Sequence, residues 1–244
     1  MNWSDDGIVL SARKHGEHAL VVQLLTQAHG RHAGLVRGGT GKRGRGVYQP
    51  GNRVSAEWSA RLAEHLGSYR CELVYGHAAE VLDDPARLAA LSAACAVAER
   101  ALAEREPHPV AYEGFIAFLA AFEGDDWPAA YVRWELGLLG ELGFGLDLSK
   151  CAATGRNDGL AYVSPKTGRA VSLSAGEPYR DRLLPLPRFL IEAGDAPPDD
   201  AAVGEGLSLT GYFLERNVFV HFAGGGLPPA RLRFADRWVG SRDD

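Results

Sequence analysis

The sequence has 244 residues, of which 46% are hydrophobic and 23% charged, with a formal net charge of −5 at pH 7. This composition is typical of a folded globular chain and excludes general disorder. No stretch approaches the roughly 18 uninterrupted apolar residues of a membrane-spanning helix, and the acidic N-terminus does not resemble a secretory signal. Three widely spaced cysteines fit a reducing compartment better than a disulfide framework. We therefore expect a cytoplasmic protein without membrane contact.

The charge is unevenly distributed along the chain. Residues 31–70 hold eight basic and two acidic side chains, a local net charge of +6, whereas residues 81–244 hold 16 basic and 24 acidic ones. An acidic protein does not need a basic patch for solubility. The patch therefore indicates a binding site for a polyanion.

The first part of the chain has the pattern of short β-strands. Apolar or alternating runs are bounded by turn residues such as glycine, proline and asparagine. Expected strands cover residues 7–13, 19–25, 33–36, 54–58 and 69–74. Five short strands in so little sequence predict a small closed barrel or sandwich, and a barrel would leave no free sheet edges.

The second part is predicted to be helical. Asp84 followed by Pro85 indicates an N-cap with proline in the first turn, and apolar residues then recur at helical spacing up to residue 102. Further helices are expected around 115–122, from Asp126 to about 142, and over 207–222. Residues 107–109, which include two prolines, are expected to break the pattern, and residues 195–200 to form a linker.

Residues 160–173 have the pattern of a hairpin with a five-residue loop at 164–168. The expected class is α+β: a β-barrel domain over residues 1–80, followed by a helical domain over 81–244 with an inserted hairpin at about 146–175.

Two kinds of chemical site are excluded by spacing. The segment Gly38–Lys42 looks like a phosphate-binding loop, but the motif needs glycine where Val36 stands and a hydroxyl residue where Arg43 stands. It also precedes a predicted strand, not a helix. Cys151 has Thr154, not a second cysteine, three residues further on, so no structural zinc is expected. We find no nucleophilic triad or paired catalytic acid, and we expect no enzyme activity, metal or cofactor.

The basic, glycine-rich segment 37–46 is the strongest functional feature. Its glycines allow close approach to a partner, and Arg37, Lys42, Arg43 and Arg45 can contact phosphates. We expect a flexible loop suited to a nucleic-acid backbone without base reading. The alternative is a merely solvated loop.

Aromatic residues near this segment add a second possible contact. Trp58, Tyr48 and Tyr69 are candidates for stacking on bases. Trp58 has an equally good alternative as an inward core residue of an alternating strand.

Residues 34–39, 49–52 and 60–67 resemble the N-terminal domain of the RecO family of DNA repair proteins. Residues 146–155 and 162–171 resemble its central hairpin, and the resemblance covers nearly the whole chain in the same order. It implies an OB-fold, a helical domain and a recombination mediator without catalytic residues or a nucleotide requirement. Some members carry four zinc-binding cysteines in the hairpin. This chain keeps only Cys151, which implies a zinc-less remnant of a zinc-ribbon-like region.

The resemblance also implies partners. Such proteins bind single- and double-stranded DNA, anneal strands, and act with RecR to load RecA onto strands coated by single-stranded DNA-binding protein, whose acidic C-terminal tail they contact. For DNA we take Arg37, Lys42, Arg43, Arg45, Arg31 and Trp58 as candidate residues. For the tail we take Arg100, Arg105 and Arg133. An interaction adaptor with incidental DNA contact is the alternative, and a hydrolase or nuclease is disfavoured.

Overall fold

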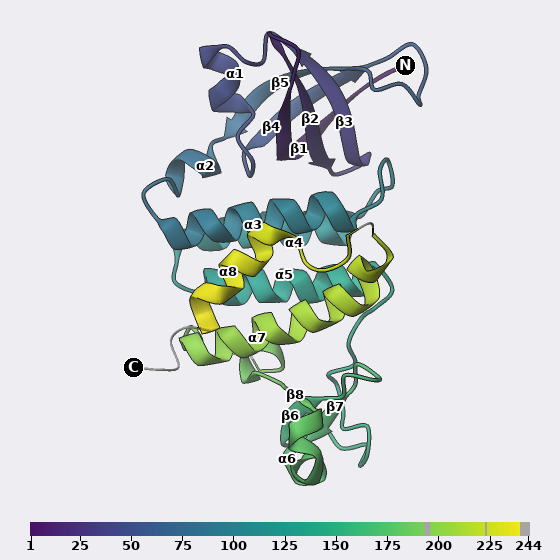
Figure 1. The fold of residues 1–244 in the computed structure, drawn as a ribbon, viewed down its shortest axis with the longest axis vertical. Helices are drawn as coiled ribbons and strands as arrows, with labels where there is room; N and C mark the ends of the chain where they lie inside the picture. Colours follow the sequence, from purple (N-terminus) through teal and green to yellow (C-terminus); the bar gives the residue numbers. More distant parts are fainter. Residues whose placement is uncertain (193–195, 223, 240–244) are drawn as a thin grey trace. The chain divides into compact units, whose positions relative to one another are not determined.

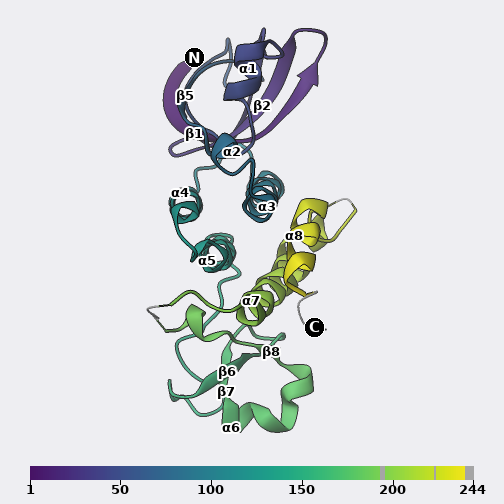
Figure 2. The same ribbon diagram turned by 90° about the vertical axis from the view of Figure 1, so that its left-hand side faces the viewer.

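The N-terminal strands close into a barrel in the order β1-β2-β3-β5-β4 (Figures 1 and 2). All neighbouring strands are antiparallel except β3 and β5, which pair in parallel only at Leu35 and Ser68. This order, closed on itself with five strands, is an OB-fold and confirms the expected α+β class. The strands are β1 (Asn2–His15), β2 (Ala19–Thr26), β3 (Gly30–Arg37), β4 (Arg53–Ser59) and β5 (Ser68–Tyr75).

The computed structural model describes residues 1–192, 196–222 and 224–239. The chain forms two units, residues 1–119 with 228–231 and residues 120–227 with 232–244. The division into domains 1–80 and 81–244 stays a prediction.

Strand β1 is longer than its apolar run predicts. Its first half pairs with β4 from Asn2 opposite Ser59 to Ile8 opposite Arg53, and its second half pairs with β2. The acidic residues at its start alternate between exposed and half-buried positions. A single strand therefore serves two neighbours, which closes the barrel and which hydrophobic pattern alone does not show.

The barrel interior is filled by inward residues of the strands together with Tyr48, which follows α1. All are less than a tenth exposed. They are Val9, Leu20, Val22, Leu24, Val36, Tyr48, Val54, Ala56, Trp58 and Tyr69.

The basic segment is not the open loop we expected, because its second half forms helix α1 (Lys42–Val47). Three glycines within or beside six residues give it poor helix propensity. Tertiary contacts compensate: Tyr48 at its end is buried in the barrel, and the Asn52 side chain donates to the carbonyls of Gly46 and Val47. The prediction of a segment without fixed geometry is therefore wrong for residues 42–46.

Helices α2 (His77–Glu80), α3 (Pro85–Ala101) and α4 (Pro109–Ala120) complete the first unit. The Asp84 carboxylate caps α3, accepting from the backbone N–H groups of Ala86 at 2.9 Å and Arg87 at 3.0 Å. This confirms the expected N-cap. The expected break near 107–109 is present between α3 and α4, and Pro109 itself begins α4, since proline suits a first helical position.

In the second unit, α5 (Trp127–Glu141) packs against α7 (Asp200–Phe213), where the Thr210 hydroxyl donates to the buried Glu135 carboxylate at 2.5 Å. The predicted hairpin is present as β6 (Leu160–Val163) and β7 (Ala170–Ser172). A third strand, β8 (Leu184–Pro185), joins β6. Shorter elements are α6 (Leu173–Gly176) and 3-10 turns at Ala121–Glu123, Glu177–Arg182 and Arg188–Leu190.

The last predicted helix has different ends. Helix α7 starts at Asp200, because the Asp199 carboxylate accepts from the N–H of Ala202 at 2.8 Å. After Phe213 the chain continues as a π-helical turn (Leu214–Val218) and a 3-10 turn (Phe219–His221). Of the predicted linker 195–200, position 195 lies outside the described residues, and the last residue, Asp200, belongs to α7.

Helix α8 (Pro229–Val239) was not predicted, because its many charged residues make its apolar pattern difficult to recognise in the sequence. Buried Phe234 lies with its ring centre 4.7 Å from that of Tyr131. No helix in the described part of the chain has the length and apolar character needed to cross a membrane.

Candidate nucleic-acid interface

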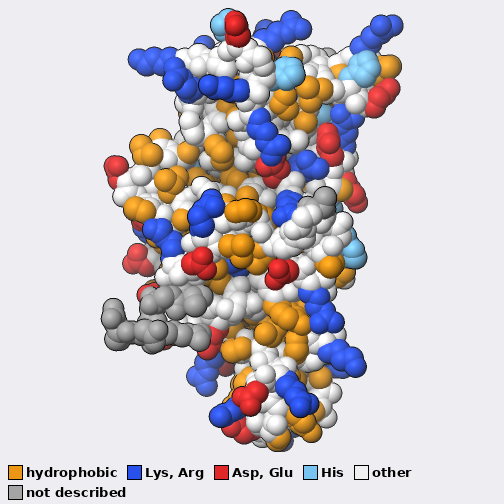
Figure 3. All heavy atoms as spheres, viewed as in Figure 1, with side chains coloured by type: hydrophobic (Ala, Val, Ile, Leu, Met, Phe, Trp, Pro, Cys, Tyr) orange, Lys and Arg blue, Asp and Glu red, His pale blue; other side chains and the backbone are white. Residues whose placement is uncertain are grey.

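The four predicted phosphate-contacting residues of segment 37–46 are all exposed. Arg37 ends β3, and Lys42, Arg43 and Arg45 lie on α1. Figure 3 shows Lys and Arg side chains over the α1 end of the barrel. Within the described ranges none of these four side chains forms an ion pair. We call these four residues the basic cluster, and their charge is available to a partner.

A groove of about 890 Å³ lies beside the basic cluster. It follows from the sparse pairing of β3 with β5, which leaves the two strands apart beyond Leu35 and Ser68. Arg37 and Arg70 line it together with Glu57. The remaining lining residues are Asn2, Trp3, Ser4, Leu35, Val36, Tyr48, Trp58, Ser59, Ser68, Tyr69 and Cys71. The groove thus combines two cations, one acid and an aromatic floor.

The titratable groups of the groove floor are uncharged at neutral pH. Burial raises the pKa of the Tyr48 and Tyr69 hydroxyls above their ordinary value, and raises the pKa of the Cys71 thiol to about 12. The floor therefore adds no negative charge to repel a phosphate backbone. The chemistry is suited to binding a polyanion, with no nucleophile ionised at neutral pH in the groove.

Trp58 is a core residue in this structure. It is 2% exposed, its indole N–H donates to the carbonyl of Leu66 at 3.0 Å, and its ring stacks near Trp3 at 5.6 Å. Only the core interpretation of the alternating strand agrees with this burial. Trp58 is therefore a core residue and not the base-stacking residue that the sequence also allowed. The strand period already contained that signal.

Arg31 does not join the basic cluster. Its Nε donates to the carbonyl of Leu102 at 2.9 Å, and its own carbonyl accepts from the N–H of Arg105 at 2.7 Å. The side chain is held by the segment after α3. The structure therefore gives Arg31 a partner inside the protein, which short-range sequence patterns do not reveal.

Arg105, a predicted partner-binding residue, is also used internally. Its two Nη atoms donate to the carbonyls of Ala63, at 2.6 Å, and His65, at 2.9 Å. Its backbone adopts a positive φ of 64°. These bonds anchor the loop between β4 and β5, residues 60–67, and engage both Nη atoms of the guanidinium.

The other two predicted partner-binding arginines lie in different units. Arg100 is half-buried near the end of α3. Arg133 on α5 is exposed, but Nη1 lies 2.8 Å from the Asp126 carboxylate, Nη2 donates to the Phe189 carbonyl at 3.2 Å, and its guanidinium stands 5.5 Å from the Phe189 ring centre. Part of its charge is thus already matched by Asp126.

Cys151, in the segment leading to the hairpin, is buried. Its Sγ accepts from the Ser172 N–H at 3.2 Å and lies 3.5 Å from the Ser172 hydroxyl. Burial acts to raise the pKa of this thiol, but hydrogen bonds from Ser172 and Thr154 outweigh it and lower the pKa to about 6. One thiol with two hydroxyl neighbours does not fit zinc, which needs four donors, and no group of three metal-binding side chains occurs in the part described.

Two lining residues, Arg70 and Trp3, were not among the sequence candidates. Arg70 occupies an outward position of the alternating strand β5, opposite Glu57 on β4. It lies within the basic segment 31–70, so charge and strand period together could have identified it. Trp3 gave no signal because its strand was predicted to start later.

Family models described as Recombination protein O N terminal and Recombination protein O C terminal match residues 1–76 and 82–223. Among curated relatives, the DNA repair protein RecO of Rhodospirillum centenum is 57% identical over 242 residues, covering 98% of this chain and 95% of its own length. Those of Rhodospirillum rubrum and Phenylobacterium zucineum are each 54% identical, covering 97% of this chain and 96% and 97% of their own. Matches of this extent, over an OB barrel and a helical region, show that the chain belongs to the RecO family.

Proposed function

We propose that this chain is a recombination mediator in DNA repair, which binds DNA through the basic cluster and the adjoining groove without reading sequence. The relatives are named as DNA repair proteins. The observation that carries the proposal is the set of four exposed cations beside a groove with an uncharged aromatic floor. Phosphate contacts of this kind position a backbone but carry no base information.

Strand annealing follows from the same charges. Two backbones repel each other, and cations that neutralise phosphates lower this repulsion as counterions are released. Helix α1 gives three of the cations a fixed spacing on one side of the barrel. A protein of this kind needs neither nucleotide hydrolysis nor a catalytic group, and we propose that it is not an enzyme.

We further propose that it acts with RecR and with the acidic tail of the single-stranded DNA-binding protein to help load RecA, in the cytoplasm at the nucleoid. Arg100 and Arg133 stay candidates for the tail. Arg105 is better explained as an anchor for residues 60–67, because both Nη atoms already donate to carbonyls.

The test of DNA binding replaces Arg37, Lys42, Arg43 and Arg45 together by Ala and measures affinity for single-stranded DNA against salt. For every phosphate that is no longer neutralised, the slope of log affinity against log salt is expected to fall by about 0.7. The matched control replaces Arg156, Lys166, Arg180 and Arg182, four exposed cations of the second unit. An unchanged slope in the first variant would remove the basic cluster from the interface.

Annealing of complementary strands coated by the single-stranded DNA-binding protein, with and without its acidic tail, tests the mediator role. Faster annealing that depends on the tail supports it. Capture of the tail without any annealing would favour the adaptor alternative, in which DNA contact is incidental.

A further inference from the structure

We propose that a second cavity of the barrel unit, beside Trp3, binds one unpaired nucleobase of a DNA strand lying in the groove. The inference rests on the proposed DNA binding and specifies which form of DNA the site prefers. The cavity has a volume of about 580 Å³, within the roughly 300–1,000 Å³ range of small-molecule sites. Its lining is Met1, Asn2, Trp3, Ala28, His29, His32, Trp58, Ala63, Arg105 and Pro107.

The cavity adjoins the groove. Asn2, Trp3 and Trp58 line both. A strand whose phosphates contact Arg37 in the groove therefore has a short route for turning one base past Trp3. The groove supplies the backbone contacts, and the cavity supplies contacts that only a base can use.

The aromatic wall of the cavity is ordered before any ligand binds. Trp3 stacks on His29 with ring centres 4.1 Å apart and planes 8° apart, and on Trp58 at 5.6 Å and 17°. Trp3 thus lies between His29 and Trp58, and because Trp58 is only 2% exposed, the accessible end of this stack on which a base can lie is the His29 ring.

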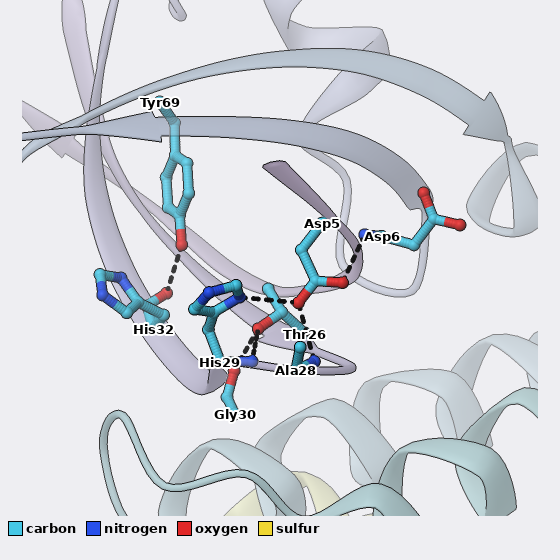
Figure 4. Close-up of polar contacts among 8 residues, drawn as sticks. All are labelled: Asp5, Asp6, Thr26, Ala28, His29, Gly30, His32 and Tyr69. Carbon is cyan, nitrogen blue, oxygen red and sulfur yellow. Dashed lines mark hydrogen bonds and ion pairs between the residues drawn. The ribbon is translucent and has the colours of Figure 1, made fainter. Parts of the chain in front are cut away.

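Asp5 fixes His29 in this wall, and Figure 4 shows the contact between the two side chains. The His29 Nδ1 lies 3.0 Å from an Asp5 carboxylate oxygen, and the same oxygen accepts from the N–H of Ala28 at 2.8 Å. The N–H of His29 also donates to the Thr26 hydroxyl at 3.2 Å. The side chain is only 34% exposed, so the ring is held at the cavity with little freedom.

His32 offers a hydrogen-bond acceptor. Its side chain is buried, at 4% exposure, and its Nδ1 lies 2.9 Å from the carbonyl of Ala33. A carbonyl only accepts, so Nδ1 carries the proton and Nε2 has a free lone pair. Burial lowers the pKa of His32 and keeps the ring neutral at pH 7. Nε2 has no hydrogen-bond partner among the described residues, and it is therefore available to an N–H donor of a ligand.

Arg105 offers a donor. Its Nη atoms are engaged with Ala63 and His65, but its Nε is buried without a hydrogen bond, 3.7 Å from the Glu104 carboxylate. A buried N–H without an acceptor is costly, and a ligand acceptor removes that cost. His32 thus gives the cavity one unmet acceptor, and Arg105 gives one buried unmet donor that a ligand reaches after a shift of the side chain.

The pairing edge of every DNA base carries an N–H next to an acceptor. Adenine and cytosine have an amino group beside a ring nitrogen, while guanine and thymine have a ring N–H beside a carbonyl. The cavity therefore takes any base, but only one whose pairing edge is free. This selects unpaired strands over duplex without reading sequence.

The experiment compares a single strand with bases and an abasic strand of equal length and phosphate number, and adds a duplex of the same length, which carries twice as many phosphates. The wild-type protein is expected to bind the strand with bases about tenfold more tightly than the abasic strand, as stacking of one base predicts. Single strands containing 2-aminopurine are expected to lose fluorescence on binding, and duplexes are not. This fluorescence test needs no variant and is unaffected by folding defects.

Two variants locate the effect. His32→Asn keeps a donor for the Ala33 carbonyl and removes Nε2, and Trp3→Leu removes the stacked ring; thermal unfolding confirms that each is folded. Both are expected to reduce the preference for bases at least threefold. His32 does not line the groove, so His32→Asn should also leave abasic binding and its salt slope unchanged.

The basic-cluster variant separates the two proposals, since it weakens both single-stranded ligands equally. Equal wild-type affinity for the strand with bases and the abasic strand, with a normal salt slope, overturns the base pocket alone. Absence of salt-dependent binding to all three ligands overturns the proposed function.

Discussion

The backbone N–H of Arg105 donates a hydrogen bond to the carbonyl of Arg31 at 2.7 Å and joins strand β3 to the segment after α3. Both guanidinium groups then bond to nearby carbonyls, Arg31 to Leu102 and Arg105 to Ala63 and His65. Two arginines that charge alone makes candidates for binding thus stabilise the barrel unit. Basic residues of this chain must be separated into those that hold the fold and those that are free to bind.

Arg31→Ala is expected to reduce stability, whereas Arg37→Ala is expected to weaken DNA binding. Loss of the bond to Leu102 should lower the free energy of unfolding by about 1–2 kcal/mol. The exposed Arg37 has no such bond, so its replacement should change stability by less than about 0.5 kcal/mol but reduce the salt slope of DNA binding by about 0.7. Urea unfolding and a salt titration check the pair. Equal stability loss in both would contradict this division.

Arg105→Lys keeps the charge but loses the fork that reaches two carbonyls. We expect faster proteolysis and hydrogen exchange in residues 60–67, with a stability loss of about 1–2 kcal/mol. Arg61→Lys, an exposed site in the same loop, is the control and should change neither. If both variants protect the loop equally, Arg105 does not anchor it.

Gly67 and Gly16 share a φ of 65° but differ in surroundings. A Cβ at Gly67 would lie 2.5 Å from the Trp58 indole, whereas a Cβ at Gly16 meets nothing within 4 Å. Gly16→Ala should cost about 1 kcal/mol of unfolding free energy through backbone strain alone. Gly67→Ala should cost at least about 1–3 kcal/mol more, because overpacking adds to that strain. Thermal unfolding of the two variants measures the difference. Similar losses of stability would show that the Trp58 side chain moves aside at little energetic cost.

Asp84→Ala removes the N-cap of α3 and should cost about 1 kcal/mol near pH 7, while Asp83→Ala next to it should cost little. Hydrogen bonds from Arg87, chiefly its backbone N–H, hold the pKa of Asp84 below its ordinary value. Its stabilising effect is therefore complete above about pH 4 and is lost as the pH falls through the depressed pKa. Urea unfolding of both variants from pH 7 to pH 2 should show that the difference between their unfolding free energies disappears in acid. A difference that persists at pH 2 would show that the stabilisation does not depend on the charge of Asp84.

Cys151 should be a thiolate at pH 8, because its pKa is lowered to about 6. In the unfolded chain the Cys151 thiol has a pKa of about 8.5. The contribution of the hydrogen-bonded Cys151 thiolate to the free energy of unfolding is therefore complete above that pH and is lost as the pH falls towards 6. Thiolate ultraviolet absorbance should titrate near pH 6 and disappear in Cys151→Ser, while Cys71→Ser leaves it unchanged, since burial holds the pKa of Cys71 at about 12. A titration near pH 8.5 would contradict the role of the Ser172 and Thr154 bonds.

The secondary structure was predictable where the signal is local. The period-two run around Val54, Ala56 and Trp58 is strand β4, and the Asp84–Pro85 pair begins α3. Predictions failed where distant parts decide: Asn2 to Asp6 become strand only through pairing with β4, and residues 42–47 become helix only because Tyr48 is buried in the barrel.

Local patterns in the chain were enough to specify the alternation that closes an OB barrel, the helix caps, and the concentration of positive charge in residues 31–70. Which of those charges are free depends on the tertiary structure. Arg37 and Arg31 are six residues apart on one strand, yet Arg37 is exposed beside the groove and Arg31 bonds to Leu102, 71 positions away. The physical reason is that strand period and composition are properties of neighbouring residues, whereas a hydrogen-bond partner is supplied by whichever segment the fold brings within reach.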